Sequence, residues 1–162
     1  MKKILILLLT AALVLSCLYG CEGKNHPNID DLQAKITSMG FTAYQDPEFY
    51  REDVCHRNFK AQNPEETIFI ECFLLTDEDY AKQMYDLLLL NAAEFLVDEN
   101  IILSQNSEFS DGDYYHVVTD TFMISIRQRG RFTLMCKTYF QNQQEAMEVL
   151  AALEFDGNEY NP

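Results

Sequence analysis

The chain has 162 residues, a formal net charge of −14 at pH 7 and a hydrophobic fraction of 48%. So acidic a surface repels the nucleic-acid backbone and no broad basic face offsets it, which excludes nucleic acid as a partner. The length corresponds to one ordinary domain that can bury a core without disulfides, and the charge also keeps such a domain off an anionic lipid surface.

The first residues have the order of a bacterial export signal. Two lysines form a positive start, residues 4–15 are almost wholly apolar, and small residues and a cysteine follow. The ending at residues 18–21, Leu-Tyr-Gly-Cys, resembles a bacterial lipobox, in which a small residue precedes a cysteine that is lipidated and becomes the new N-terminus. The resemblance implies export, removal of residues 1–20, and a lipid anchor at Cys21 on the extracytoplasmic side of the cell membrane.

Other interpretations of this leader stay open. A transmembrane anchor needs about 17 to 25 apolar residues, whereas the apolar run at residues 4–19 falls just short and contains polar residues. A simple secretory signal would need no cysteine at its cut. Cys17 also follows a small residue, but the chain after it is still apolar, whereas the chain after Cys21 is polar. We therefore expect a signal peptide at 1–20, a tether at 21–27, a single α+β domain at 28–155 and a loose tail at 156–162.

Periodicity predicts the elements of the first half of the domain. Asn28 is the expected N-cap of a helix whose apolar residues recur at helical spacing, and Gly40 is its expected stop. Strands are expected at residues 41–44, 57–62 and 67–75, with a turn at residues 63–66.

The longest helix is expected to start at Thr76, with Asp79 completing a capping box. Because several large apolar residues recur at helical spacing, this helix is expected to bury one broad stripe. The expected stripe comprises Tyr80, Met84, Leu87, Leu88, Asn91 and Phe95.

From residue 105 onward the apolar period changes to two, which is typical of strands. The Asp-Gly pair at residues 111–112 signals a hairpin. Strands are expected at residues 114–119, 122–128 and 131–140. A last helix is expected after Asn142, which pairs with Glu145 as its cap. The inward residues of that helix are expected to be Ala146, Val149, Leu150 and Leu153.

This order predicts an α+β fold. Grouped strands with short connections favour an antiparallel sheet of about six strands over a parallel one. The three helices and the strands follow the order α-β-β(β)-α-β-β-β-α.

Three cysteines would keep free thiols if Cys21 carries the lipid. Cys72 and Cys136 lie among apolar residues at period two and are expected to point inward, while Cys55 is expected to be the most accessible. Three thiols cannot all pair within one chain, so whether a disulfide forms stays open. No CxxC motif is present, and a thiol-redox role has no support.

The sequence lacks the motifs of common catalytic and cofactor sites, namely GxGxxG, the P-loop, GxSxG and HExxH. Cys55 and His56 could contribute to a metal or thiol site, but metal ligands normally cluster at short spacing. His116, between Tyr115 and a valine, is more typical of a half-exposed strand residue than of a general acid or base. We therefore expect no catalytic residue, no cofactor and no metal.

Three arginines at the last expected hairpin, Arg127, Arg129 and Arg131, form the one basic cluster of the sequence. Such a cluster could clamp a carboxylate or phosphate of a partner, or pair with acidic residues of its own chain.

The sequence favours a lipid-anchored, extracytoplasmic binding or accessory domain of the bacterial cell envelope, without catalysis. Its expected partners are the membrane, through the lipid anchor, and an envelope protein. One alternative is a small envelope enzyme with a site near His116 and Tyr115, which predicts a histidine beside a carboxylate in a pocket. The other is an inhibitor or immunity-type module for a basic partner, which predicts an exposed aromatic patch ringed by acidic residues.

Overall fold

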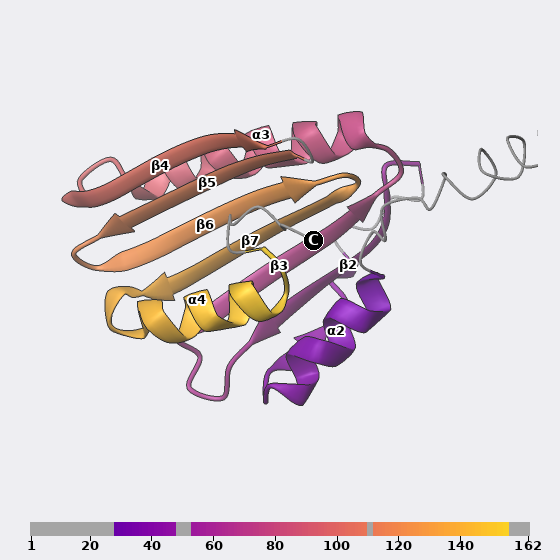
Figure 1. The fold of residues 1–162 in the computed structure, drawn as a ribbon, viewed down its shortest axis with the longest axis horizontal. Helices are drawn as coiled ribbons and strands as arrows, with labels where there is room; N and C mark the ends of the chain where they lie inside the picture. Colours follow the sequence, from indigo (N-terminus) through magenta and orange to yellow (C-terminus); the bar gives the residue numbers. More distant parts are fainter. Residues whose placement is uncertain (1–27, 48–52, 110–111, 156–162) are drawn as a thin grey trace, which may run out of the picture.

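The computed structural model describes residues 28–47, 53–109 and 112–155, which form a sheet with helices on both of its faces (Figure 1). The elements are α2 (Ile29–Ser38), β1 (Thr42–Tyr44), β2 (Cys55–Gln62), β3 (Ile68–Leu75), α3 (Glu78–Phe95), β4 (Ile101–Phe109), β5 (Gly112–Thr119), β6 (Phe122–Arg129), β7 (Phe132–Tyr139), the short 3-10 helix η2 (Phe140–Asn142) and α4 (Gln143–Ala152). The seven strands are antiparallel and lie in the order β1-β2-β3-β7-β6-β5-β4. The predicted α+β class is confirmed, with one strand more than expected.

The helix and the hairpin at the start of the domain form for local reasons. The side chain of Asn28 accepts a hydrogen bond from the backbone N–H of Asp30 at 3.1 Å, and Gly40 ends the helix with a φ of +93°. Between β2 and β3, the side-chain oxygen of Asn63 accepts from the backbone N–H groups of Thr67 and Ile68 at 2.8 and 2.9 Å. These contacts confirm the predicted cap and the predicted turn.

The middle of the sheet joins distant parts of the chain. Strand β3 pairs with β2 on one side and with β7 on the other, so that Ile70 lies opposite Cys136. Strands β4 to β7 then follow one another as a meander. Both edges of β3 are therefore paired within the sheet. The predicted inward position of Cys72 is confirmed at 0% exposure, whereas Phe69 on the opposite face of the strand is 39% exposed.

Alternation along the strands gives each face of the sheet its own core. On one face, α2 and α4 pack over residues such as Phe59, Ile70 and Leu134. On the other face, α3 packs over residues such as Phe73 and Ile126. None of the helices in the described ranges combines the length and apolarity that a membrane crossing requires.

The start of α3 differs from the prediction. Asp77, not Thr76, is the N-cap, and its carboxylate accepts from the backbone N–H of Tyr80 at 2.8 Å. Thr76 is engaged elsewhere, because its backbone N–H and its hydroxyl both donate to the carbonyl oxygen of Val54, at 3.0 and 3.3 Å. The cap therefore moves one residue along the chain.

The buried stripe of α3 is also rotated from the predicted one. The residues that pack fully against the sheet are Ala81, Tyr85, Leu88 and Ala92. Of the six predicted residues, only Leu88 belongs to that buried stripe. The reason is tertiary, since two alanines allow the helix to approach the sheet closely while the bulkier residues lie beside the contact.

The C-terminal helix confirms the prediction in its packing but not in its cap. Ala146, Val149 and Leu150 are buried and Leu153 is 1% exposed. Asn142 precedes α4, but its side chain makes no capping hydrogen bond. The expected signal peptide, tether and tail, and Asp111 of the hairpin signal, lie outside the described residues.

Candidate functional site

A pocket lies between α3 and the sheet, and the rotation of α3 creates it. The first turns of the helix are held close to β7, where the hydroxyl of Thr133 donates to the carbonyl oxygen of Ala81 at 2.9 Å. Ala81 and Ala92 keep the contact short, and both are almost fully buried. Met84, Leu87 and Phe95 of α3 consequently project beside the contact, where they line the pocket.

The pocket has a cavity volume of about 580 Å³. Its floor comes from the α3-facing residues of β2, β3, β6 and β7, and its roof from α3. The lining residues are Lys60, Thr67, Phe69, Glu71, Phe73, Met84, Leu87, Leu88, Asn91, Ala92, Phe95, Phe122, Ile124, Met135, Lys137, Thr138 and Tyr139. Most of this surface is apolar, as is usual for sites that take small molecules.

Four large apolar side chains of the pocket lining remain exposed, and they are called the rim of the pocket below. Phe69 is 39% exposed, Leu87 is 45% exposed, and Phe95 and Tyr139 are 52% and 54% exposed. They come from β3, α3 and β7 and all belong to the pocket lining. A contiguous exposed apolar surface of this kind is typical of a binding site.

Lys137 is one of two lysines in the pocket lining. It lies on β7 between Phe69 of β3 and Ile124 of β6 in the strand register. Its ammonium nitrogen Nζ lies 3.6 Å from the ring centroid of Phe95 and 5.6 Å from that of Phe122. Partial burial lowers the pKa of Lys137 below its ordinary value, because the charged form loses water.

Lys60, the other lysine of the lining, has a different environment. Its Nζ lies 2.8 Å from Oδ2 of Asp46 and 3.3 Å from Oε1 of Glu71. The hydrogen bond with Asp46 is the main reason that the pKa of Lys60 is raised. The charge of Lys60 is therefore already balanced by two carboxylates of the protein.

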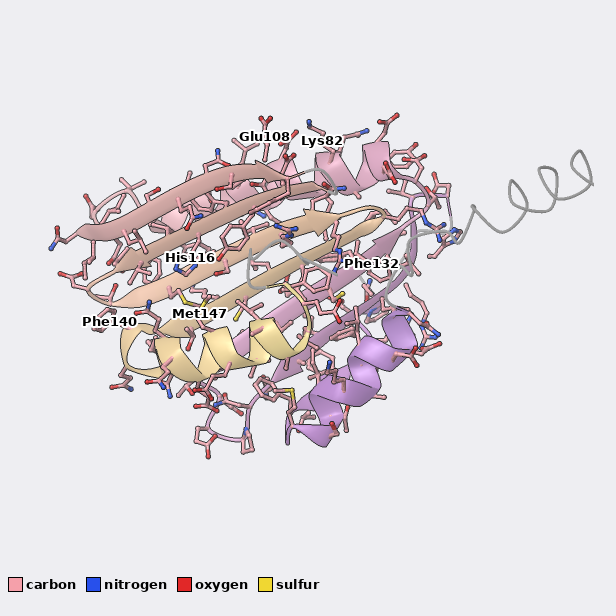
Figure 2. The ribbon with its side chains drawn as sticks, viewed as in Figure 1. Lys82, Glu108, His116, Phe132, Phe140 and Met147 are labelled. Carbon is pink, nitrogen blue, oxygen red and sulfur yellow. The ribbon has the colours of Figure 1, made fainter. Side chains whose placement is uncertain are left out.

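His116 lies away from this pocket, on the sheet face that carries α4 (Figure 2). It is 5% exposed, so the expectation of a half-exposed residue is wrong. Its Nδ1 lies 2.6 Å from Oγ of Ser125, and its ring stacks on that of Tyr114 with centroids 6.0 Å apart. Tyr115 points to the opposite face, where it packs against the α3 core, so the strand separates the two residues of the proposed enzyme site.

The three arginines have different surroundings, although Arg127 and Arg129 lie two residues apart on β6. Arg127 is 3% exposed and its guanidinium lies 4.3 Å from the ring centroid of Phe109. Nη1 of Arg129 lies 3.3 Å from Oε2 of Glu154, while Arg131 is exposed beside the start of α3. Binding of a partner by these arginines stays a prediction.

All three thiols of the described residues are buried and unpaired. Cys72 and Cys136 are 0% exposed, as predicted for inward positions, and Cys55 is only 2% exposed. Strands β3 and β7 are neighbours, but Cys72 lies opposite Leu134 in the register and not opposite Cys136. His56 is exposed, whereas Cys55 is buried, and the described residues contain no cluster that could hold a metal ion.

Sequence reasoning did not identify the pocket, although one signal for it was present. The helix carries more large apolar residues than a single core stripe can bury, and five of the six residues of the predicted stripe line the pocket. The position of Lys137 beneath Phe95 had no local signal, because the two residues come from different elements far apart in the chain.

Comparison with known proteins assigns no family. No protein-family profile matches the chain, and no curated protein matches it either. Among solved structures, it is similar to the solution structure of cyanobacterial PsbP (CyanoP) from Synechocystis sp. PCC 6803, with a TM-score of 0.36 and 8% sequence identity over 70% of this chain and 80% of that chain. A similarity of that extent assigns no function to this chain.

Proposed function

We propose that this protein is a lipid-anchored, extracytoplasmic binding domain of the bacterial cell envelope, without catalysis, and that it holds a small apolar ligand beneath α3. The observation that carries the proposal is the apolar pocket of about 580 Å³ with its exposed rim. Small-molecule sites usually have volumes of about 300 to 1,000 Å³ and mostly apolar walls.

Burial of apolar surface supplies the driving force. Four large apolar side chains of the rim are each more than a third exposed, and contact of their apolar surface with water is unfavourable. A ligand that covers them would contribute about 25 cal/mol for each Å² of apolar surface removed from water. The pocket therefore suits a ligand with a substantial apolar part.

The chemistry of the lining favours binding over catalysis. Among the described residues that line the pocket there is no histidine, cysteine or serine, and its charged groups are Lys60, Glu71 and Lys137. Glu71 is ion-paired with Lys60, which also pairs with Asp46, so these charged groups are engaged with one another and not poised for proton transfer. The enzyme alternative near His116 receives no support, because that histidine is buried against Ser125.

Binding of a neutral fluorescent probe tests this proposal. The mature chain, residues 21–162 with Cys21→Ser, would be titrated with N-phenyl-1-naphthylamine. We expect saturable binding at one site, and Leu87→Gln at the rim should weaken it about fivefold because apolar contact area is lost.

Leu90→Gln is the matched control, since Leu90 lies on the same helix, is 69% exposed and does not line the pocket. This variant should bind the probe as the native chain does. Absence of saturable binding to the native chain, or equal loss in both variants, would contradict the proposed site.

A further inference from the structure

We infer that the ligand of this pocket is a free amphiphile with an apolar tail and a single anionic head, and that Lys137 binds that head. This inference rests on the proposed function and adds the chemical class of the ligand. Its basis is the combination of an apolar cavity with one cation, Lys137, that no acidic side chain of residues 28–47, 53–109 or 112–155 pairs with.

The charge of Lys137 is not balanced by an acidic side chain of the described residues. Its ammonium lies among aromatic rings, and none of the ion pairs in the described parts of the chain includes it. Aromatic faces attract a cation but do not neutralise it. A cation that is partly removed from water, and has only such contacts, is stabilised when a negative group arrives.

The two lysines of the pocket differ in their partners. Both lysines line the same cavity, but Lys60 is held between Asp46 and Glu71. An anionic ligand would compete with those two carboxylates at Lys60, whereas at Lys137 it would meet no carboxylate partner of the described chain. The pocket thus contains one site for an anion, which matches a ligand with one charged head.

The walls of the pocket suit an apolar tail. Around Lys137 the floor and roof are apolar, with Met84, Leu88 and Met135 among the lining residues. Methionine side chains are flexible and adapt to irregular apolar shapes, which suits an alkyl chain. A head bound at Lys137 would therefore place its tail along apolar walls beneath α3.

The acidic charge of the molecule decides between two sources of such a ligand. The chain has a net charge of −14, which opposes approach to the surface of an anionic bilayer. The electrostatic repulsion between the protein and a dissolved amphiphile with one charge is much smaller than that between the protein and an anionic bilayer. We therefore assign the pocket to a free amphiphile and not to a lipid in the plane of the membrane.

The test compares two ligands that differ only in the head, dodecanoate and dodecan-1-ol. Each would displace N-phenyl-1-naphthylamine from the mature chain with Cys21→Ser. Lys137→Met keeps an apolar stem and removes the charge, so it should weaken dodecanoate binding by about 10- to 100-fold, because a hydrogen bond to a charged group is lost. Binding of dodecan-1-ol should change less than twofold, which also shows that the variant is folded.

Lys82→Met is the control for overall charge. Lys82 lies on α3 (Figure 2), its side chain is 66% exposed, and it does not line the pocket. This variant has the same net charge as Lys137→Met, so a general electrostatic effect would weaken dodecanoate binding equally in both. Equal weakening would overturn the role of Lys137.

The remaining outcomes separate the inference from the proposed function. If neither ligand binds the native chain, the proposed function itself is wrong. If both bind with similar affinity and Lys137→Met changes neither, the apolar site stands and the anionic head is wrong. Binding of the native chain to phosphatidylglycerol vesicles without binding of dodecanoate would overturn the assignment to a free amphiphile.

Discussion

Buried His116 makes the stability of the fold sensitive to acid. Burial lowers the pKa of His116 below its ordinary value of 6.5, because the charged imidazole would lose water. A base with a depressed pKa in the folded state contributes stability above pH 6.5, and this contribution is lost as the pH falls through the folded-state pKa.

We therefore expect the free energy of unfolding to fall below pH 6.5 by up to about 1.4 kcal/mol per pH unit from this residue. His116→Gln should flatten that dependence in urea unfolding measured between pH 7 and pH 5. His56→Gln, at an exposed position, should leave the slope unchanged. An unaltered slope in His116→Gln would contradict the explanation.

Buried thiols give a second prediction at the scale of single residues. Burial raises the pKa of Cys136 to about 12 and raises that of Cys72 further. Because the thiolate is the reactive form, neither side chain should react with a disulfide reagent at pH 8 until the chain unfolds. Mass spectrometry of the labelled chain, with and without urea, would show this, and rapid native modification of Cys136 would disprove it.

Helix α3 combines a close contact with a binding wall, and the two functions use different side chains. Ala81 lies on the side of α3 that faces the sheet and is 0% exposed, whereas Leu90 projects into solvent. Ala81→Leu should destabilise the fold by about 1 to 3 kcal/mol, because extra methylene groups cannot fit in a well-packed contact. Leu90→Ala should stay within about 0.5 kcal/mol of the native chain. Urea unfolding would measure both, and similar effects of the two changes would contradict this division of the helix.

The β4–β5 hairpin depends on a glycine that has no space for a side chain. Gly112 has a φ of +147°, and an added Cβ would lie 2.0 Å from the backbone oxygen of Gln128. Gly112→Ala should therefore destabilise the fold by more than its backbone strain alone, because the added Cβ would also clash with β6. Gly40→Ala is the matched comparison, because its φ of +93° is also positive but nothing lies within 4 Å of an added Cβ.

We expect Gly40→Ala to destabilise the fold by about 1 kcal/mol and Gly112→Ala by at least twice as much. Thermal or urea unfolding of both variants would check the order. Equal costs would mean that the close approach of β6 to Gly112 does not constrain the hairpin.

For the whole molecule, the expected anchor holds an acidic domain close to a membrane. Residues 22–27 could span only about 20 Å when extended, so the domain should remain near the surface that carries the lipid. Cys21→Ala should abolish incorporation of labelled palmitate in a bacterium with lipoprotein processing and leave an unprocessed precursor. Cys17→Ala should retain the label, and the opposite pattern would place the lipid at Cys17.

Most local structure was predictable from the sequence. Apolar periodicity identified six of the seven strands in the described residues and the three helices, and it placed Cys72 and Cys136 inward, because a strand repeats every two residues and a helix every 3.6. Strand β4 was missed, because most of its residues are exposed and no buried face marks it. The cap at Asn28 and the turn around Asn63 were also predictable, because their hydrogen bonds join residues close in the chain.

The tertiary structure alone decided which strands pair and which side chains of distant elements come into contact. Pairing of β3 with β7 joins segments about 60 residues apart, and no local pattern specifies it. The approach of Ala81 to Thr133 sets the rotation of α3, so that Leu87 and Phe95 line the pocket instead of filling the core. The same long-range packing buried His116 and Arg127, which the sequence alone left at the surface, and placed Lys137 beneath Phe95. Local periodicity thus determined the elements, whereas contacts between residues distant in the chain determined the site.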